Sequence, residues 1–171
     1  MIQKKIVLLG MFGVGKTSLI RRFIYDKFED TYLSTIGVKV SEKTCPPVMD
    51  NKGRAHQFQF ILWDIEGQIE EGTIPKNYLL GAAGAILVAD LTRLESFRIL
   101  KKLKEDVLSA SPEAKFIIIA NKSDLMSELT NLEDRVQSQL DPEQTYFISS
   151  AKTGENVESS FLELAKLFAG S

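Results

Sequence analysis

The sequence predicts an α/β fold, in which a mostly parallel β-sheet alternates with helices along the chain. Three short apolar runs share one design, in which each run ends at a glycine, an aspartate or an asparagine: residues 6–9 before Gly10, residues 85–89 before Asp90, and residues 116–120 before Asn121. Unbroken apolar runs of this length are typical of strands that are buried on both faces of a parallel sheet.

Helical periodicity occurs in two stretches that alternate with these runs. Residues 94 to about 108 form one such stretch, and the other carries Val157, Phe161, Leu164 and Phe168 at helical spacing. In α/β sheets, ligands bind beyond the carboxyl ends of the strands. We therefore expect the polar residues that end the strands to gather around one site.

One part of the chain departs from the parallel pattern. Residues 36–44 and 57–63 both have strand character, and residues 45–56 between them contain two prolines and a turn-forming segment at residues 50–53. This pattern predicts an antiparallel hairpin that adds one strand to the sheet. Since no repeat, low-complexity tract or linker is present, the sequence indicates a single domain over residues 1–171.

The bulk composition is that of an ordinary globular protein: of 171 residues, 44% are hydrophobic and 26% are charged. The net charge of −2 gives no electrostatic reason to expect binding to nucleic acid or to an anionic membrane. No apolar stretch approaches the ~20 residues that span a bilayer, and no signal peptide precedes the first strand. The single Cys45 suits a reducing compartment, and no cysteine near Ser171 offers a lipid anchor. We expect a cytoplasmic monomer.

The segment from Gly10 to Thr17 fits the pattern G-x-x-x-x-G-K-[ST] and directly follows the first apolar run. A strand, a glycine-rich turn and a helix that begins at the lysine build a phosphate cradle from backbone N–H groups. In such a cradle the lysine contacts the β- and γ-phosphates, and the threonine hydroxyl binds Mg²⁺. We therefore predict phosphate contacts from Gly13, Val14, Gly15, Lys16, Thr17 and Ser18.

Two further segments, each at the end of a strand, indicate which base is bound. In the segment N-K-S-D, the carboxylate of Asp124 can accept hydrogen bonds from N1–H and the exocyclic amine of guanine. Adenine has no such pair of donors, so an adenine complex would leave this charge unpaired. In the segment S-S-A-K, which follows a strand at residues 145–148, the N–H of Ala151 can meet the guanine O6. Together they favour guanine over adenine.

A third segment, W-D-I-E-G-Q at residues 63–68, supplies groups for the metal and for the reacting phosphate. Asp64 ends an apolar strand, where its carboxylate can hold Mg²⁺ through a water molecule. Gly67 can offer its N–H to the γ-phosphate, and Gln68 can orient an attacking water. With Lys16, these two residues are the predicted catalytic groups.

These motifs together resemble those of the Ras-like small GTPases, and most closely those of the Rab branch. The resemblance covers nearly all of the 171 residues and includes T-I-G-V at residues 35–38 and S-A-K-T-G-E-N-V at residues 150–157. It implies a P-loop small GTPase fold with a six-stranded, mostly parallel sheet and about five helices. It also implies two switch segments, near residues 28–40 and 64–78, which the γ-phosphate orders and hydrolysis releases.

The resemblance also assigns roles to individual side chains. It implies that Thr35 binds Mg²⁺ and the γ-phosphate, so that the metal lies among Thr17, Thr35 and Asp64. Around the base and sugar it implies contacts from Phe28, which packs on the guanine edge, and from Asn121, Lys122, Ser150 and Lys152.

Protein partners are implied at the switch segments. Rab proteins present an aromatic trio to effectors, and the matching positions here are Val40, Trp63 and Tyr78, with Ile36 as a further contact. An exposed Trp and Tyr make good interface anchors. The alternative is that Trp63 caps the core.

Two departures from the family pattern fall on the catalytic machinery. Phe12 takes a loop position that is Gly in Ras, and its ring either excludes an arginine finger, which is worth roughly 10³–10⁵ in rate, or swings outward and packs on a switch. Glu66 replaces the alanine of D-x-A-G-Q. Two unit charges ~4 Å apart repel by ~4 kcal/mol at an effective dielectric of ~20, as an upper bound. A solvated Glu66, or one that serves as a base or metal ligand, are the other interpretations.

The leading functional hypothesis is a Mg²⁺-dependent switch that hydrolyses GTP to GDP and phosphate, slowly because of Phe12 and Glu66. The alternative is a non-catalytic GTP-binding interaction module that is locked in one nucleotide state. A third possibility, a P-loop kinase or ATPase, predicts a preference for ATP, against which the segments around Asp124 and Ala151 argue.

Overall fold

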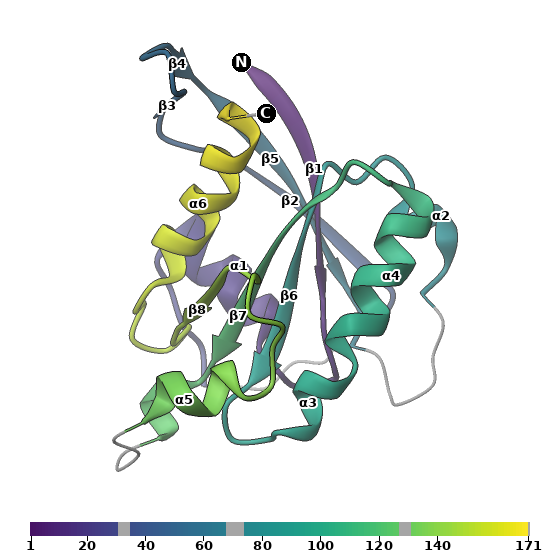
Figure 1. The fold of residues 1–171 in the computed structure, drawn as a ribbon, viewed down its shortest axis with the longest axis vertical. Coiled ribbons are helices and arrows are strands. Elements are labelled where there is room, and N and C mark those ends of the chain that lie inside the picture. The colour runs from purple at the N-terminus through teal and green to yellow at the C-terminus, as the bar shows by residue number, and fades with distance from the viewer. Residues whose placement is uncertain (31–34, 68–73, 127–130, 171) are drawn as a thin grey trace.

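The structure, a computed structural model, describes residues 1–30, 35–67, 74–126 and 131–170 (Figure 1). Its elements follow one another as β1 (Ile2–Leu9), α1 (Lys16–Tyr25), β2 (Val38–Thr44), β3 (Val48–Met49), β4 (Ala55–His56), β5 (Phe58–Ile65), α2 (Lys76–Leu79), β6 (Gly84–Asp90), α3 (Glu95–Arg98), α4 (Leu100–Ala110), β7 (Lys115–Asn121), the 3₁₀ helix η1 (Ser123–Leu125), α5 (Leu132–Gln137), β8 (Tyr146–Ile148) and α6 (Val157–Ala169).

Six strands of the described residues form one sheet, in the order β2-β5-β1-β6-β7-β8. Neighbouring strands are parallel except β2 and β5, which pair antiparallel with Val38 opposite Ile65. The predicted α/β fold with one antiparallel hairpin strand is therefore confirmed. Strand β2 begins after the predicted residue 36, because Gly37 has φ +70°, a left-handed conformation that a strand does not continue through.

The central strands are buried on both faces, as their unbroken apolar sequences predict. In β1, Ile6 and Leu8 lie in the core on one face of the sheet, whereas Val7 and Leu9 lie in the core on the other. Helices α1 and α6 cover the first face, and α2, α3 and α4 cover the second (Figure 1). The sheet is thus the middle of three layers.

The helix predicted from residue 94 to about residue 108 is present as two segments, α3 and α4. Ile99 joins them and itself has helical backbone angles, φ −82° and ψ −13°, so we count the two as one interrupted helix. Counted in this way, the described residues contain the five α-helices expected. No helix in these ranges is both long and apolar enough to cross a membrane.

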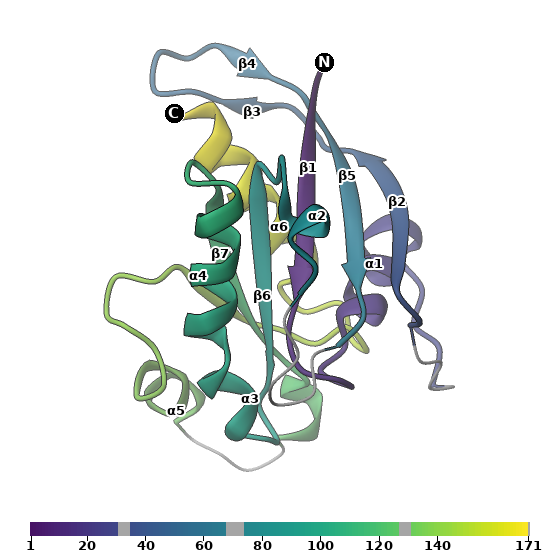
Figure 2. The ribbon, with the colours of Figure 1, turned by 90° about the vertical axis from the view of Figure 1, so that its right-hand side faces the viewer.

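The segment between β2 and β5 contains a second, two-stranded sheet, in which β3 pairs antiparallel with β4. The prolines and turn-forming residues of this segment predict only a connection between the two strands. Cys45 and Val48 of the segment are buried in the same core as α6, which anchors it to the body of the protein. Figure 2 shows the β3–β4 hairpin beyond the carboxyl end of α6.

The carboxyl ends of the five parallel strands lie at one edge of the sheet, at the bottom of Figure 1. The chain leaves β1 into residues 10–15, which we call the phosphate loop, and then into α1. It leaves β7 into η1 and leaves β8 into residues 149–156, which we call the base loop. The topology therefore brings the predicted motifs together at this edge.

Candidate functional site

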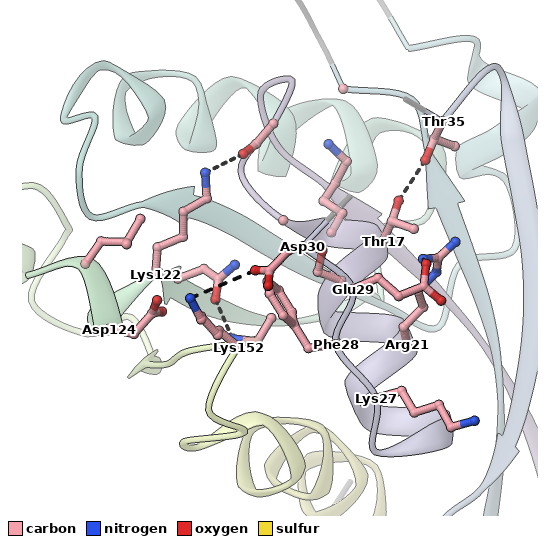
Figure 3. Close-up of a pocket in the computed structure, with 18 of the residues that line it drawn as sticks. Thr17, Arg21, Lys27, Phe28, Glu29, Asp30, Thr35, Lys122, Asp124 and Lys152 are labelled. Atoms are coloured by element: carbon pink, nitrogen blue, oxygen red, sulfur yellow. Dashed lines mark hydrogen bonds and ion pairs between the residues drawn. The ribbon is translucent and has the colours of Figure 1, made fainter. Parts of the chain in front are cut away.

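A cavity of about 290 Å³ opens at the carboxyl edge of the sheet. This volume lies near the lower end of the roughly 300–1,000 Å³ that small-molecule pockets occupy. The phosphate loop, η1 and the base loop line it, together with residues from the segment after α1. In Figure 3, Asp124 and Lys152 lie at one end and Thr17 and Thr35 at the other, with Phe28 between them.

Side chains hold every carbonyl group of the phosphate loop from Gly10 to Val14. The ammonium group of Lys16 donates to the carbonyl oxygens of Gly10 and Met11, at 3.0 Å and 3.1 Å. The next three carbonyl oxygens, of Phe12, Gly13 and Val14, each accept from one side chain: Arg93 at 2.7 Å, Lys122 at 2.7 Å and Asn121 at 2.9 Å.

This set of hydrogen bonds fixes the direction of the loop's N–H groups. A trans peptide is planar, so its N–H points opposite to its carbonyl. With five carbonyls directed at side chains, the following N–H groups, of residues 11–15, are directed to the other side of each peptide. The arrangement is that of an anion-binding cradle at a helix N-terminus.

Gly15 is required by both conformation and space. Its φ of +105° is left-handed, and a Cβ built on it would lie 2.2 Å from Nδ2 of Asn121. Asn121 needs that space, since its Nδ2 donates to Val14 while its Oδ1 accepts the N–H of Ala151 at 3.1 Å. Asn121 is buried and ties the phosphate loop to the base loop.

The three predicted metal ligands converge at the end of the pocket that Thr17 and Thr35 line, which we call the phosphate end. The Thr17 hydroxyl donates to Oδ2 of Asp64 at 2.5 Å and lies 2.7 Å from the Thr35 hydroxyl, which lies 3.4 Å from the same oxygen. The other carboxylate oxygen, Oδ1 of Asp64, is buried and has no hydrogen-bond partner among the described residues. Burial raises the pKa of Asp64 although the Thr17 hydrogen bond opposes the shift.

These residues fit Mg²⁺. One carboxylate with an unpaired buried oxygen, two hydroxyls and the phosphates of a ligand form the oxygen set by which Mg²⁺ is commonly held. The described residues contain no group of three or more His, Cys, Asp or Glu side chains that could hold a metal by themselves. The remaining ligands of a metal here would come from a bound phosphate or from water.

Lys16 is buried, with 6% of its surface exposed. Burial is the main cause that lowers the pKa of its ammonium group to about 8, and the nearby Asp64 carboxylate partly offsets the effect. A desolvated cation interacts more strongly with an anionic ligand than one in water does. Lys16 is therefore suited to hold phosphate oxygens.

We call the opposite end of the pocket, which Asp124 and Lys152 line, the base end. Here the predicted residues form hydrogen bonds and an ion pair with other residues of the site. The Ser150 hydroxyl donates to Oδ1 of Asp124 at 2.5 Å, which orients the carboxylate. The N–H of Ala151, predicted to meet a guanine O6, donates to Asn121 in this structure. Lys152 lies 3.9 Å from the carboxylate of Asp30 across the pocket (Figure 3).

Arg22 of α1 also holds the base loop, a role that none of the sequence motifs predicts. Its Nε donates to the carbonyl of Ala151 at 2.9 Å, and its guanidinium also donates to the carbonyl of Lys152. A further bond at 3.0 Å joins it to Asp26. No local pattern reveals these contacts, because Arg22 and Ala151 lie 129 residues apart in sequence.

Glu66 links the two predicted switch segments. Its N–H donates to the carbonyl of Gly37 at 2.8 Å, and its Oε2 accepts the N–H of Gly37 at 3.1 Å. The backbone bond extends the β2–β5 pairing by one residue pair beyond Val38 and Ile65. Of the interpretations of Glu66 given above, none anticipates this hydrogen-bonded contact.

Gly67 packs directly on the phosphate loop. A Cβ at this position would lie 2.4 Å from Cα and 2.6 Å from N of Phe12, so only glycine fits. The Phe12 residue lines the pocket and is 42% exposed. Gln68, the predicted water-orienting residue, lies outside the described residues.

The predicted effector residues lie on β2, β5 and α2, and in the segment just before β2. Ile36 is 87% and Val40 51% exposed, and Val40 pairs across the sheet with Trp63. The rings of Trp63 and Tyr78 lie 6.5 Å apart, and the ammonium group of Lys5 lies 3.8 Å from the Trp63 ring centroid. Trp63 is half-buried, so it both covers the core and contributes to the surface.

Comparison with known proteins gives one consistent result. The Ras family model matches residues 5–169. The Ras-related protein SEC4 of Saccharomyces cerevisiae is 36% identical over 164 residues, which cover 95% of this chain and 74% of that protein. The Ras-related protein RABD2b of Arabidopsis thaliana and the GTP-binding protein YPTM2 of Zea mays are each 35% identical and match 94% of this chain and 77% of their own length.

Proposed function

The chain belongs to the Ras family of small GTPases, close to its Rab members, and on this premise we propose that it is a Mg²⁺-dependent switch with slow intrinsic turnover. Guanine-nucleotide binding and GTP hydrolysis are the activities of the family. The Mg²⁺ requirement, the slow rate and the roles of single residues are the parts that we propose.

One observation carries the proposal. The hydroxyls of Thr17 and Thr35 converge on Asp64, in the same pocket whose other end holds Asp124 in a fixed orientation. In our proposal, the triphosphate and its metal bind at Thr17, Thr35 and Asp64, and the guanine base binds at Asp124. Separate phosphate and base sites within one pocket suit a nucleotide, and the carboxylate of Asp124 at the base end favours guanine.

In the proposed reaction, a water oxygen bonds to the γ-phosphorus while the bond to the β–γ bridging oxygen breaks. Lys16 holds the β- and γ-phosphates, and the N–H of Gly67 faces the γ-phosphate. Gln68 orients the attacking water. Bound Mg²⁺ supplies positive charge that offsets the charge on the phosphate oxygens.

Two residues support slow turnover. Phe12 lines the pocket and is 42% exposed, and we infer that its ring obstructs an arginine supplied by a partner protein. The carboxylate of Glu66 lies near enough to raise the pKa of Lys16, although burial and other charges act on that group more strongly. A negative charge so close to the phosphate end opposes the γ-phosphate.

A single-turnover phosphate-release assay tests the proposal, with wild type compared with the double variant Phe12→Gly, Glu66→Ala in the presence and absence of Mg²⁺. We expect slow Mg²⁺-dependent cleavage by wild type, and release at least about tenfold faster from the double variant when an arginine-donating activating protein is added, a fraction of the range attributed to an arginine finger. Glu105→Ala, at an exposed position on α4, is the control.

The outcomes separate the alternatives. Wild-type cleavage at roughly 5–20 s⁻¹ without a partner, as in an activated GTPase, contradicts slow turnover. GTP binding without cleavage in either protein indicates instead a non-catalytic interaction module. Competition by ATP as strong as that by GTP contradicts guanine recognition.

A further inference from the structure

Arg93, in the turn after β6, makes a contact with the phosphate loop that the functions above do not use. Its Nη2 donates to the carbonyl oxygen of Phe12 at 2.7 Å, and its Nε donates to Oδ2 of Asp90 at 3.3 Å. The planar guanidinium group therefore joins a strand end to the loop by two of its fixed donors.

Asp90 holds a second cation against the same loop. Its Oδ2 lies 2.8 Å from the ammonium group of Lys122, which donates to the carbonyl of Gly13 at 2.7 Å. Asp90 is 1% exposed, and Thr92 donates to its other oxygen from both N–H and hydroxyl. Although burial alone would raise it, these hydrogen bonds hold the pKa of Asp90 below its ordinary value, so the carboxylate stays charged.

The peptide between Phe12 and Gly13 needs such an external hold. Gly13 has φ +75° and, without a Cβ, accepts many backbone conformations at little cost. If the carbonyl of Phe12 rotated, the N–H of Gly13 would rotate with it, because the two groups lie in one plane. A hydrogen bond to the carbonyl of Phe12 therefore helps to keep that N–H directed into the phosphate cradle.

We propose that Arg93, held by Asp90, is a positioning residue for the phosphate loop, which fixes the Phe12–Gly13 peptide so that the Gly13 N–H meets the phosphates of the nucleotide. The inference rests on the proposed function. It assigns Arg93 no contact with the reacting atoms and places its effect on the geometry of the cradle.

The charge of Arg93 acts in the same direction. Burial is the larger cause of the lowered pKa of Lys16, but Arg93 is close enough to contribute to it. Arg93 and Glu66 are opposite charges that both act on Lys16.

The test compares wild type with Arg93→Ala, Arg93→Lys and the control Arg98→Ala, which changes an exposed arginine on α3. Two properties are measured: the rate of GDP release, and the ³¹P resonance of the β-phosphate of bound GDP. We expect Arg93→Ala to release GDP roughly tenfold faster, since a hydrogen bond from a charged donor is lost, and to shift the β-phosphate resonance.

The GDP release rate of Arg93→Lys should fall between those of wild type and Arg93→Ala. An ammonium group can still donate to the Phe12 carbonyl, but it lacks the forked donors by which a guanidinium group also binds Asp90. Arg98→Ala should match wild type. The melting temperature distinguishes a purely structural role from a positioning role. If Arg93→Ala lowers the melting temperature but leaves the β-phosphate resonance of bound GDP unchanged, the inference is overturned. It is overturned equally if both nucleotide measurements match wild type.

The two proposals fail in different ways. Wild-type protein that does not bind GDP contradicts the proposed function, and the inference falls with it. Wild-type protein that binds GDP, together with an Arg93→Ala variant of unchanged release rate and spectrum, contradicts the inference alone.

Discussion

The two ends of the pocket are built in different ways. At the base end, the protein groups hydrogen-bond one another: Ser150 orients Asp124, and Asn121 holds the N–H of Ala151. At the phosphate end, the carboxylate of Asp64 keeps one buried oxygen without a hydrogen-bond partner among the described residues. The hydrogen-bonding groups of the base end are thus paired within the protein, whereas the phosphate end keeps a buried acceptor that a bound cation would contact.

Because of this difference, binding of the base and binding of the phosphates and metal depend on parts of the pocket that are organised in different ways. A base end that is preorganised by its own hydrogen bonds gains affinity because little ordering is needed on binding. A buried carboxylate oxygen that lacks a partner is costly, so a bound cation that contacts it stabilises the segments that carry Thr17, Thr35 and Asp64. The state of the switch can therefore depend on the ligand at one end while the other end stays unchanged.

The largest expected effect comes from removing the carboxylate of Asp124, which we propose reads the base. In Asp124→Ala, GDP affinity should fall by about 10²–10⁴-fold, because two hydrogen bonds to a charged acceptor are lost at ~1.5–3 kcal/mol each. Competition with a fluorescent GDP analogue measures this affinity, and the affinity for ADP should be the same in the variant and in wild type. Asp141→Ala, at another exposed aspartate, should leave GDP affinity as it is. If Asp124→Ala and wild type bind GDP equally, base recognition does not lie at this end.

A smaller effect distinguishes two roles of Glu66 at the phosphate end. Glu66→Gln removes the charge but keeps an oxygen that can accept the Gly37 N–H, whereas Glu66→Ala removes both. We expect both variants to raise the affinity for GTP relative to GDP, by up to roughly tenfold after screening by nearby cations.

Only Glu66→Ala should also loosen the tie between the switch segments, and faster amide hydrogen exchange at Gly37 would report it. A Gln variant whose GTP-to-GDP affinity ratio equals that of wild type rules out charge repulsion as the role of Glu66. Equal exchange at Gly37 in the Ala variant and wild type rules out the tie.

The smallest expected effect concerns the proton on Lys16. With a pKa of about 8 in the nucleotide-free protein, this group loses its charge as pH rises through 8, and a bound phosphate restores the charged form. GDP binding should therefore take up roughly 0.2 proton at pH 7.5 and roughly 0.8 proton at pH 8.5. Calorimetry in two buffers of different ionisation enthalpy measures this uptake.

The sign of the accompanying stability change is also fixed. The folded pKa of Lys16 lies below its ordinary value of 10.5, so the unfolded chain binds more protons between pH 8 and 10.5. Unfolding free energy of the nucleotide-free protein should gain a positive contribution from Lys16 as pH rises through this window. Lys16→Gln should abolish both the proton uptake and this contribution, and uptake that persists in that variant contradicts the assignment.

The sequence by itself determined the fold class, because apolar runs buried on both faces and helical periodicity are local patterns. It also identified the groups that meet at the pocket, since Gly10–Thr17, Asp124 and Ala151 follow strands, and Asp64 lies near the end of one, whose carboxyl ends share one edge. The interruption at Ile99 has no clear signal in the residues themselves. The turn-forming residues 50–53 indicate a reversal of the chain, but they do not show that Val48 and Met49 pair with His56 and Ala55.

Only the tertiary structure decided how the pocket is held. Arg22 and Arg93 bond to backbone carbonyls, which every residue possesses, so no residue type at the partner position marks the contact. Their partners lie 129 and 81 residues away in the chain. A motif records which side chains a ligand touches, whereas the hydrogen bonds that orient those side chains depend on which distant segments the folded sheet places side by side.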